Sequence, residues 1–213
     1  MNPILVYTIC AVVGYLCGCF SLSFLLGKLK GFDIRTRGTN NAGASNAVIT
    51  LGAKAGVAVG ACDIFKSLIP VIVLSLIFPS AGYPLVKFIT GVACVAGHMH
   101  PFYMGFRGGK GFATFIGMML GICWWFGLCV LAGVVLVAYL TDYIVSGTIL
   151  TITALPLFIL FYEANWIGAV IVGAMSLIIL FRHRKNLVRM ADRTESSVRE
   201  TLLKKERLWK QKG

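Results

Sequence analysis

Long runs without a charged residue set the limits on what this chain can fold into. The longest covers residues 111–141, and residues 3–26 form another at the start of the chain. A membrane-spanning helix needs about 20 mostly apolar residues. A soluble domain of 213 residues that are 58% hydrophobic and 13% charged would leave too much apolar surface in water, and disorder requires low hydrophobicity. The sequence therefore predicts an all-α polytopic membrane protein.

We expect seven transmembrane helices. A single helix over residues 111–141 would be roughly 46 Å long, against a hydrocarbon core of about 30 Å. We therefore expect it to break at residues 121–127, where Trp124 and Trp125 suit a membrane–water interface. The other spans are expected at residues 3–26, 55–78, 84–104, 147–161 and 166–181.

The basic residues predict the orientation. The chain has 20 Lys and Arg against 8 Asp and Glu, a net charge of +12. With seven spans, the basic segments 27–54, 105–110 and 182–213 all fall on one side, which the positive-inside rule makes cytoplasmic. The N-terminus is then outside and the C-terminus inside. We expect a membrane domain over residues 1–196 and a basic cytoplasmic tail over 197–213 that meets anionic lipids, with no nucleic acid as partner.

Residues 37–46 form the first of four polar clusters on this side. Gly38 and Gly43 allow backbone N–H groups to converge on an anion, and several side chains can add donors. These donors are Thr39, Asn41, Ser45 and Asn46. An ordinary flexible loop with helix caps is the alternative interpretation.

The second and third clusters lie close together in the sequence. His98 and His100 are two apart and do not share a helix face, which argues against a paired metal site. Lys110 follows Gly108 and Gly109 and precedes an expected helix, an arrangement that suits an anion. The alternatives are an interfacial histidine and a lysine that only anchors the topology.

The fourth cluster begins at Arg182. His183 and Asn186 are three residues apart, so they face the same way on a helix. A stop-transfer charge cluster is the alternative.

Asp63 and Lys66, also three apart, lie inside an expected span, where we favour mutual neutralisation over a functional pair. Together the four clusters offer anion-binding groups, no strong nucleophile and no metal site, which indicates a phosphate-binding site at a membrane surface.

In this order, the clusters resemble the motifs of the bacterial acyl-phosphate:glycerol-3-phosphate acyltransferases (PlsY). Residues 38–46 resemble the family's G-S-G-N-x-G-A-T-N, 63–66 its D-x-x-K, 97–101 its G-H-x-x-P, and 108–114 its G-G-K-G-x-A-T. Residues 143–146 resemble a Y-x-x-S inner loop, and 183–186 the final H-R-x-N.

This resemblance implies transfer of an acyl chain from acyl phosphate to the 1-hydroxyl of glycerol 3-phosphate, without metal or cofactor. It also implies roles for individual residues. Thr39, Lys110, His183 and Asn186 would be catalytic. Arg37, Gly38, Asn41, Gly43, Ala44, Ser45, Asn46, Gly108, Gly109 and Arg182 would bind substrate, and His98 would support the local architecture of that site.

Some positions depart from the family pattern. Asn40 replaces a glycine that needs positive φ, and Asn tolerates that conformation better than most residues. Ile49 stands where relatives carry an arginine, and Asp142 where they carry a basic residue.

Two alternatives to the acyltransferase stay open: a small transporter of a phosphorylated solute, and an inactive paralogue. Transporters place polar groups near the midplane, often in repeated halves, and no repeat is evident here.

Overall fold

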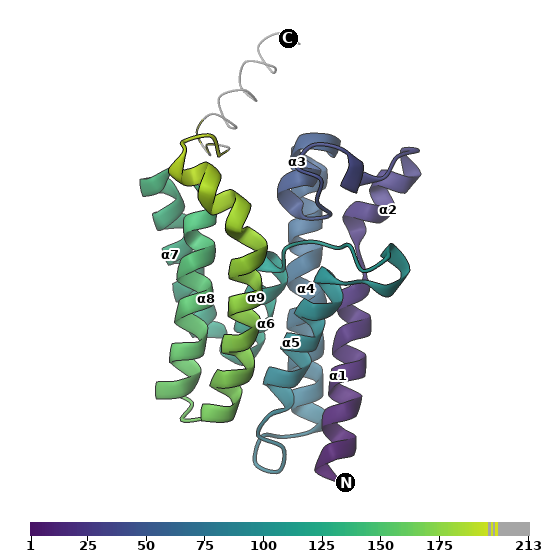
Figure 1. The fold of residues 1–213 in the computed structure, drawn as a ribbon. Coiled ribbons are helices and arrows are strands. Elements are labelled where there is room, and N and C mark those ends of the chain that lie inside the picture. The colour runs from purple at the N-terminus through teal and green to yellow at the C-terminus, as the bar shows by residue number, and fades with distance from the viewer. Residues whose placement is uncertain (196, 198, 200–213) are drawn as a thin grey trace.

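The computed structural model describes residues 1–195, 197 and 199, and over these the chain is helical with no strand (Figure 1). The helices are α1 (Pro3–Cys19), α2 (Leu22–Leu29), α3 (Ala44–Leu51), α4 (Ala53–Ile77), α5 (Val86–Met99), α6 (Phe112–Ile122), α7 (Trp124–Thr141), α8 (Ile144–Phe161) and α9 (Trp166–Ala191), with 3₁₀ turns η1 (Ile34–Thr36) and η2 (Phe102–Met104). The prediction of an all-α chain is confirmed for this part of the sequence.

The first expected span is interrupted. Residues 3–26 are expected to form one helix, but α1 ends at Cys19 and Phe20 leaves the helical conformation, with ψ 126°. Ser21 then begins α2 by accepting a hydrogen bond from the Phe24 N–H at 3.4 Å. A serine side chain at this position satisfies one of the free N–H groups of a new helix, which a run of apolar residues cannot do.

The break expected in residues 111–141 is confirmed at Cys123, which separates α6 from α7. Trp124 starts α7 and is 68% exposed. The seventh span was expected to end at residue 181, but α9 continues to Ala191. The sixth begins earlier than expected, at Ile144.

Close packing joins α1 to α5 and the central helices to α9. A Cβ on Gly18 would lie 2.0 Å from the carbonyl oxygen of Cys94, so only glycine lets these two helices approach so closely. The main core lies between α4, α5, α6, α7, α8 and α9 and includes Phe88, Phe115 and Ile179, all fully buried.

Five segments are long and apolar enough to cross a membrane: Pro3–Leu29, which combines α1 and α2, and the helices α4, α7, α8 and α9. The expected third and fourth spans are shorter. Helix α5 has 14 residues, about 21 Å, and α6 has 11, about 17 Å. The third span was expected to reach residue 104, but α5 ends at Met99, before Pro101.

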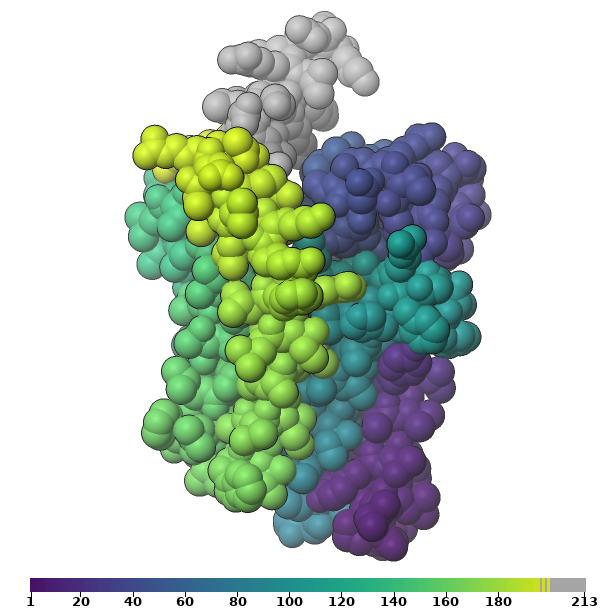
Figure 2. All heavy atoms as spheres, viewed as in Figure 1, coloured from purple at the N-terminus to yellow at the C-terminus, as the bar shows by residue number. Residues whose placement is uncertain are grey.

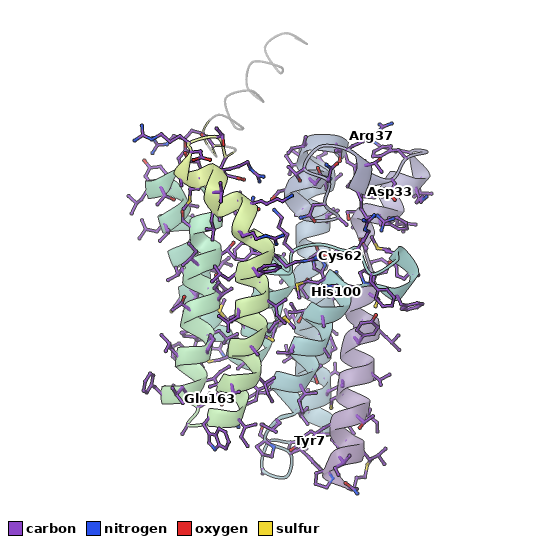
Figure 3. All side chains as sticks on the ribbon, viewed as in Figure 1. Tyr7, Asp33, Arg37, Cys62, His100 and Glu163 are labelled. Atoms are coloured by element: carbon purple, nitrogen blue, oxygen red, sulfur yellow. The ribbon has the colours of Figure 1, made fainter. Side chains whose placement is uncertain are left out.

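The two short helices leave their connection inside the depth of the bundle. Figure 3 shows Arg37 and Asp33 at one end of the molecule, Tyr7 and Glu163 at the other, and His100 between them. In the space-filling view, the α5–α6 connection (teal) lies below the first loop (blue) and beside α9 (yellow) (Figure 2). The fold therefore leads three of the polar clusters toward one region below the Arg37 end.

Candidate active site

The glycines of the α5–α6 connection pack against the end of α5. The N–H of Gly108 donates to the Met99 carbonyl at 2.9 Å, and that of Gly109 to the His98 carbonyl at 3.1 Å. A Cβ on Gly108 would lie 2.0 Å from the His98 carbonyl oxygen, and one on Gly109 would lie 2.0 Å from His98 Nε2. Both N–H groups are therefore occupied, and we assign the two glycines to close packing rather than to anion binding.

Beneath this connection lies a buried group of three ionisable side chains. Lys66 Nζ lies 2.7 Å from both Asp63 Oδ1 and His98 Nδ1. It also donates to the Phe20 carbonyl oxygen at 2.9 Å. A lysine ammonium has three donors and no acceptor, so His98 accepts through Nδ1 and carries its proton on Nε2, the atom that faces Gly109. Lys66 and Asp63 neutralise each other, as the sequence predicts. His98 packs against Gly109 and so supports the connection that carries Lys110.

Arg182 ties the connection to α9. Its Nη2 donates to the Met99 carbonyl at 3.0 Å and to the Gly109 carbonyl at 3.2 Å. Its Nε and Nη1 make no hydrogen bond to the described residues, so they are available to an anion. The fourth cluster thus contributes both to the scaffold and to the positive charge of this region.

Lys110, His183 and Asn186 come together where the connection meets α9. Lys110 Nζ donates to Asn186 Oδ1. His183 is buried, and its Nδ1 lies 2.9 Å from the Ile179 carbonyl oxygen, to which it can only donate. Nε2 then carries a free lone pair and has no partner among the described residues. The expected helical face is confirmed, and it offers a cation and a proton acceptor side by side.

The charges around Lys110 are unbalanced. Burial lowers the pKa of the Lys110 amine, and the nearby Arg189 and Arg182 lower it further, while Glu195 acts in the opposite direction. An anion that enters this region would meet two arginines and a lysine with one carboxylate among them, which favours phosphate.

Asn46 organises the first loop. Its Oδ1 accepts from the Thr39 N–H at 2.8 Å, and its Nδ2 donates to the carbonyls of Ile34, Arg37 and Asn41 at 2.9, 3.1 and 2.6 Å. The side chain is buried and its amide is fully used. We therefore assign Asn46 to loop support rather than to substrate contact.

The backbone of this loop needs positive φ at two positions. Gly38 has φ 61° and Asn40 has φ 53°, so the expectation that Asn40 takes the left-handed conformation of a glycine is confirmed. A Cβ on Gly38 would also lie 2.2 Å from Asn46 Oδ1. Asparagine can thus replace glycine at position 40 and keep the loop conformation.

The other predicted ligands of the first loop differ in their exposure. Arg37, Thr39 and Ser45 are exposed, and the Arg37 guanidinium lies 4.1 Å from the centre of the Phe32 ring. Gly43 and Ala44 are half-buried at the start of α3, and Asn41 Oδ1 is buried without a partner among the described residues.

No hydrogen bond or ion pair in residues 1–195 joins residues 37–46 to Lys110, His183 or Asn186. The segment before the first loop is instead linked to the α5–α6 connection, which carries Lys110. The link runs through Arg35, whose Nη1 donates to the carbonyls of Met104 and, at 3.2 Å, Arg107. The arrangement is two sets of anion-binding groups near one end of a helical bundle.

A family model described as glycerol-3-phosphate acyltransferase matches residues 8–193. The chain belongs to the glycerol-3-phosphate acyltransferase family. It is 34% identical to the glycerol-3-phosphate acyltransferase of Desulfotalea psychrophila over 87% of this chain and 95% of the relative. It is also 34% identical to that of Clostridioides difficile over 90% and 95%.

Two solved structures of PlsY, described as an integral membrane glycerol 3-phosphate acyltransferase, share the fold. The glycerol 3-phosphate form is 31% identical, covers 90% of this chain and 94% of its own, and has a TM-score of 0.76. The lysophosphatidic acid form is 29% identical, covers 92% and 98%, and has a TM-score of 0.77. The resemblance to the PlsY family is therefore confirmed.

In this acyltransferase chain, two residues near the site carried no role in the sequence interpretation. Arg35 pairs with Asp33 at 2.7 Å, and its guanidinium lowers the pKa of that carboxyl. Glu195 bonds Asn186 and Arg189 from beyond α9. The bonds that bring Arg35 to the site, to the carbonyls of Met104 and Arg107, join segments far apart in sequence, and those of Glu195 cross a chain reversal. The only sequence signal for Glu195 was weak: it follows Thr194 a few residues after the motif at 183–186.

Proposed function

We propose that the protein transfers a fatty acyl group from acyl phosphate to the 1-hydroxyl of glycerol 3-phosphate and so makes lysophosphatidic acid for phospholipid biosynthesis. The observation that carries the proposal is the bond between Lys110 and Asn186, with His183 and its unpartnered Nε2 on the same face of α9. The related PlsY structures, in glycerol 3-phosphate and lysophosphatidic acid forms, support the substrate and the product.

The reaction needs no covalent enzyme intermediate. Acyl phosphate is a mixed anhydride, and the glycerol 3-phosphate hydroxyl oxygen attacks its carbonyl carbon. A new ester C–O bond forms, the C–O bond to phosphate breaks, and the bonding electrons leave with inorganic phosphate. The hydroxyl proton passes to Nε2 of His183, which has a free lone pair. Positioning and charge stabilisation supply the remaining acceleration.

Two phosphate groups must be held at once. We assign the acyl phosphate group to the first loop, with Thr39 and Ser45 hydroxyls and the Arg37 guanidinium as outward donors. We assign the glycerol 3-phosphate to Lys110 and the free Nε and Nη1 of Arg182. This division places the acceptor hydroxyl next to His183, because Lys110 bonds Asn186, which lies three residues after His183 on the same face of α9.

We also propose the topology. Seven spans, with α5 and α6 as the third and fourth, place the first loop and the end of α9 on the cytoplasmic side of the bacterial inner membrane and the N-terminus outside. Arg37 lies at the opposite end of the molecule from Glu163 and Tyr7, which supports this orientation (Figure 3). The basic tail, residues 197–213, falls mainly outside the described residues, and contact with anionic lipid remains a proposal for it.

Purified protein supplied with palmitoyl phosphate and glycerol 3-phosphate tests the function through release of inorganic phosphate and formation of lysophosphatidic acid. We expect both products in equal amounts, and Lys110→Ala to lower the rate to the background. Wild-type release no faster than that of Lys110→Ala would overturn the proposal in favour of an inactive paralogue. Product formation from acyl-CoA but not from acyl phosphate would contradict the assigned donor.

A further inference from the structure

Glu195 lies beyond the end of α9 and folds back toward the site. Its Oε1 accepts from Asn186 Nδ2 at 3.0 Å, and its Oε2 accepts from Arg189 Nε at 2.8 Å. Two backbone bonds to the Arg189 carbonyl hold this turn, from the N–H of Thr194 at 2.8 Å and from that of Glu195 at 3.1 Å. The carboxylate is thus fixed against the same helix that carries His183.

The Asn186 amide has its two ends occupied by partners of opposite chemistry. Lys110 is a donor and bonds Oδ1, while Glu195 is an acceptor and bonds Nδ2. Reversing the amide would set its NH₂ against an ammonium and its oxygen against a carboxylate. The orientation of Asn186 therefore follows from Glu195 as much as from Lys110.

We propose that Glu195 is a positioning residue, which orients the Asn186 amide so that its oxygen holds the Lys110 ammonium in place for substrate phosphate. The proposal rests on the proposed function. Without the carboxylate, the Asn186 NH₂ is free to rotate, and Lys110 loses a fixed acceptor. Arg189 would also lose its partner and would compete with Lys110 for the incoming anion.

Charge acts in the same direction as geometry. The ionisable groups near Lys110 are Arg182, His183, Arg189 and Glu195, with His98 and His100 at the end of α5 behind the connection. Glu195 is the group that raises the pKa of the Lys110 amine. Its removal should therefore lower that pKa further and deprotonate more of Lys110 at a given alkaline pH.

Labelling of Lys110 by an amine-reactive acylating reagent, followed by peptide mass spectrometry over pH 7–10, tests this without requiring activity. Only the neutral amine reacts, so we expect Glu195→Gln to label Lys110 about threefold faster than wild type at pH 8, with a midpoint at lower pH. Asp192→Asn is the matched control, because Asp192 lies exposed in the same turn. Lys66, buried with three partners, reports on unfolding and should stay slow in all variants.

Kinetics complete the test. We expect Glu195→Ala to lower kcat/KM for glycerol 3-phosphate about tenfold, and Glu195→Gln to lose less, because its amide oxygen can still accept from Asn186. Asp192→Asn should match wild type. A Glu195→Ala variant whose kcat/KM for glycerol 3-phosphate lies within twofold of Asp192→Asn, or whose Lys110 midpoint equals that of wild type while Lys66 stays slow, would overturn the positioning role. Absence of activity in wild type would instead overturn the proposed function. The labelling of Lys110 would then decide the positioning role by itself, because it does not require activity.

Discussion

The ammonium of Lys66 lies 2.9 Å from the carbonyl oxygen of Phe20, the residue that follows the end of α1. Phe20 interrupts the first helix, and a carbonyl released there would be costly in an apolar environment. Lys66 satisfies it while it also bonds Asp63 and His98. One side chain thus joins the α1–α2 break, α4 and the end of α5 beneath the Gly109–Lys110 connection.

Lys66→Met should therefore destabilise the fold strongly. It leaves the Asp63 carboxylate buried without its cation and frees the Phe20 carbonyl, and breaking a buried pair costs about 3–5 kcal/mol. Thermal unfolding in detergent measures the loss. Lys87→Met is the control, because its 2.6 Å pair with Glu163 is more exposed, with side chains 15% and 22% accessible, and should cost about 1 kcal/mol or less. Equal losses for the two variants would contradict the linking role of Lys66.

Gly109→Ala should lower activity because it displaces Lys110. The added methyl would lie 2.0 Å from His98 Nε2, so the connection must move away from α5 and carry Lys110 with it. We expect kcat/KM to fall at least tenfold, because small displacements of a catalytic group are costly. Gly173→Ala on α9 is the control, since its nearest neighbour would be Pro156 at 4.0 Å. Activity of Gly109→Ala within twofold of this control would contradict the packing role.

The sequence predicted the elements that depend on apolar length and on local signals. The break between α6 and α7 and the left-handed Asn40 are examples, and both follow from neighbours along the chain. The interruption at Phe20 was not predicted, because the carbonyl it frees is satisfied by Lys66, 46 residues away. The sequence also predicts Gly108, Gly109 and Asn46 as substrate ligands. Their bonds to the end of α5 and to the loop backbone appear only once the chain is folded.

The pH dependence of activity should follow Lys110. Its cationic form binds phosphate, and burial lowers its pKa, so activity should fall as pH rises through a value below that of a free lysine. Lys110→Arg should have lower activity at neutral pH, because a guanidinium is too large for the bond to Asn186, but should lose the alkaline decline up to about pH 11. Rate against pH for both proteins, with the exposed Lys54→Arg as control, makes the comparison. If Lys110→Arg loses activity at alkaline pH just as wild type does, the decline belongs to another titrating group.

Ile49 stands where the resemblance to the PlsY motif implies an arginine, and it offers a sharp test of the donor phosphate site. It is 56% exposed on α3 and lies four residues after Ser45, so the two share the outward face of that helix. An isoleucine there contributes nothing to an anion held by Ser45. A guanidinium at this position would add a charge-assisted hydrogen bond to the phosphate that we assign to the first loop.

Ile49→Arg should therefore lower KM for acyl phosphate about three- to tenfold, while kcat and KM for glycerol 3-phosphate stay near wild type, since the new charge faces only the loop that holds the donor. Ile49→Glu places the opposite charge on the same exposed site and should raise KM for acyl phosphate by a similar factor. Both effects should weaken at 0.5 M salt, because the site is open to solvent. Steady-state kinetics at two salt concentrations separate this from a packing effect. If Arg and Glu at position 49 shift KM in the same direction, the first loop does not hold the donor phosphate beside Ser45.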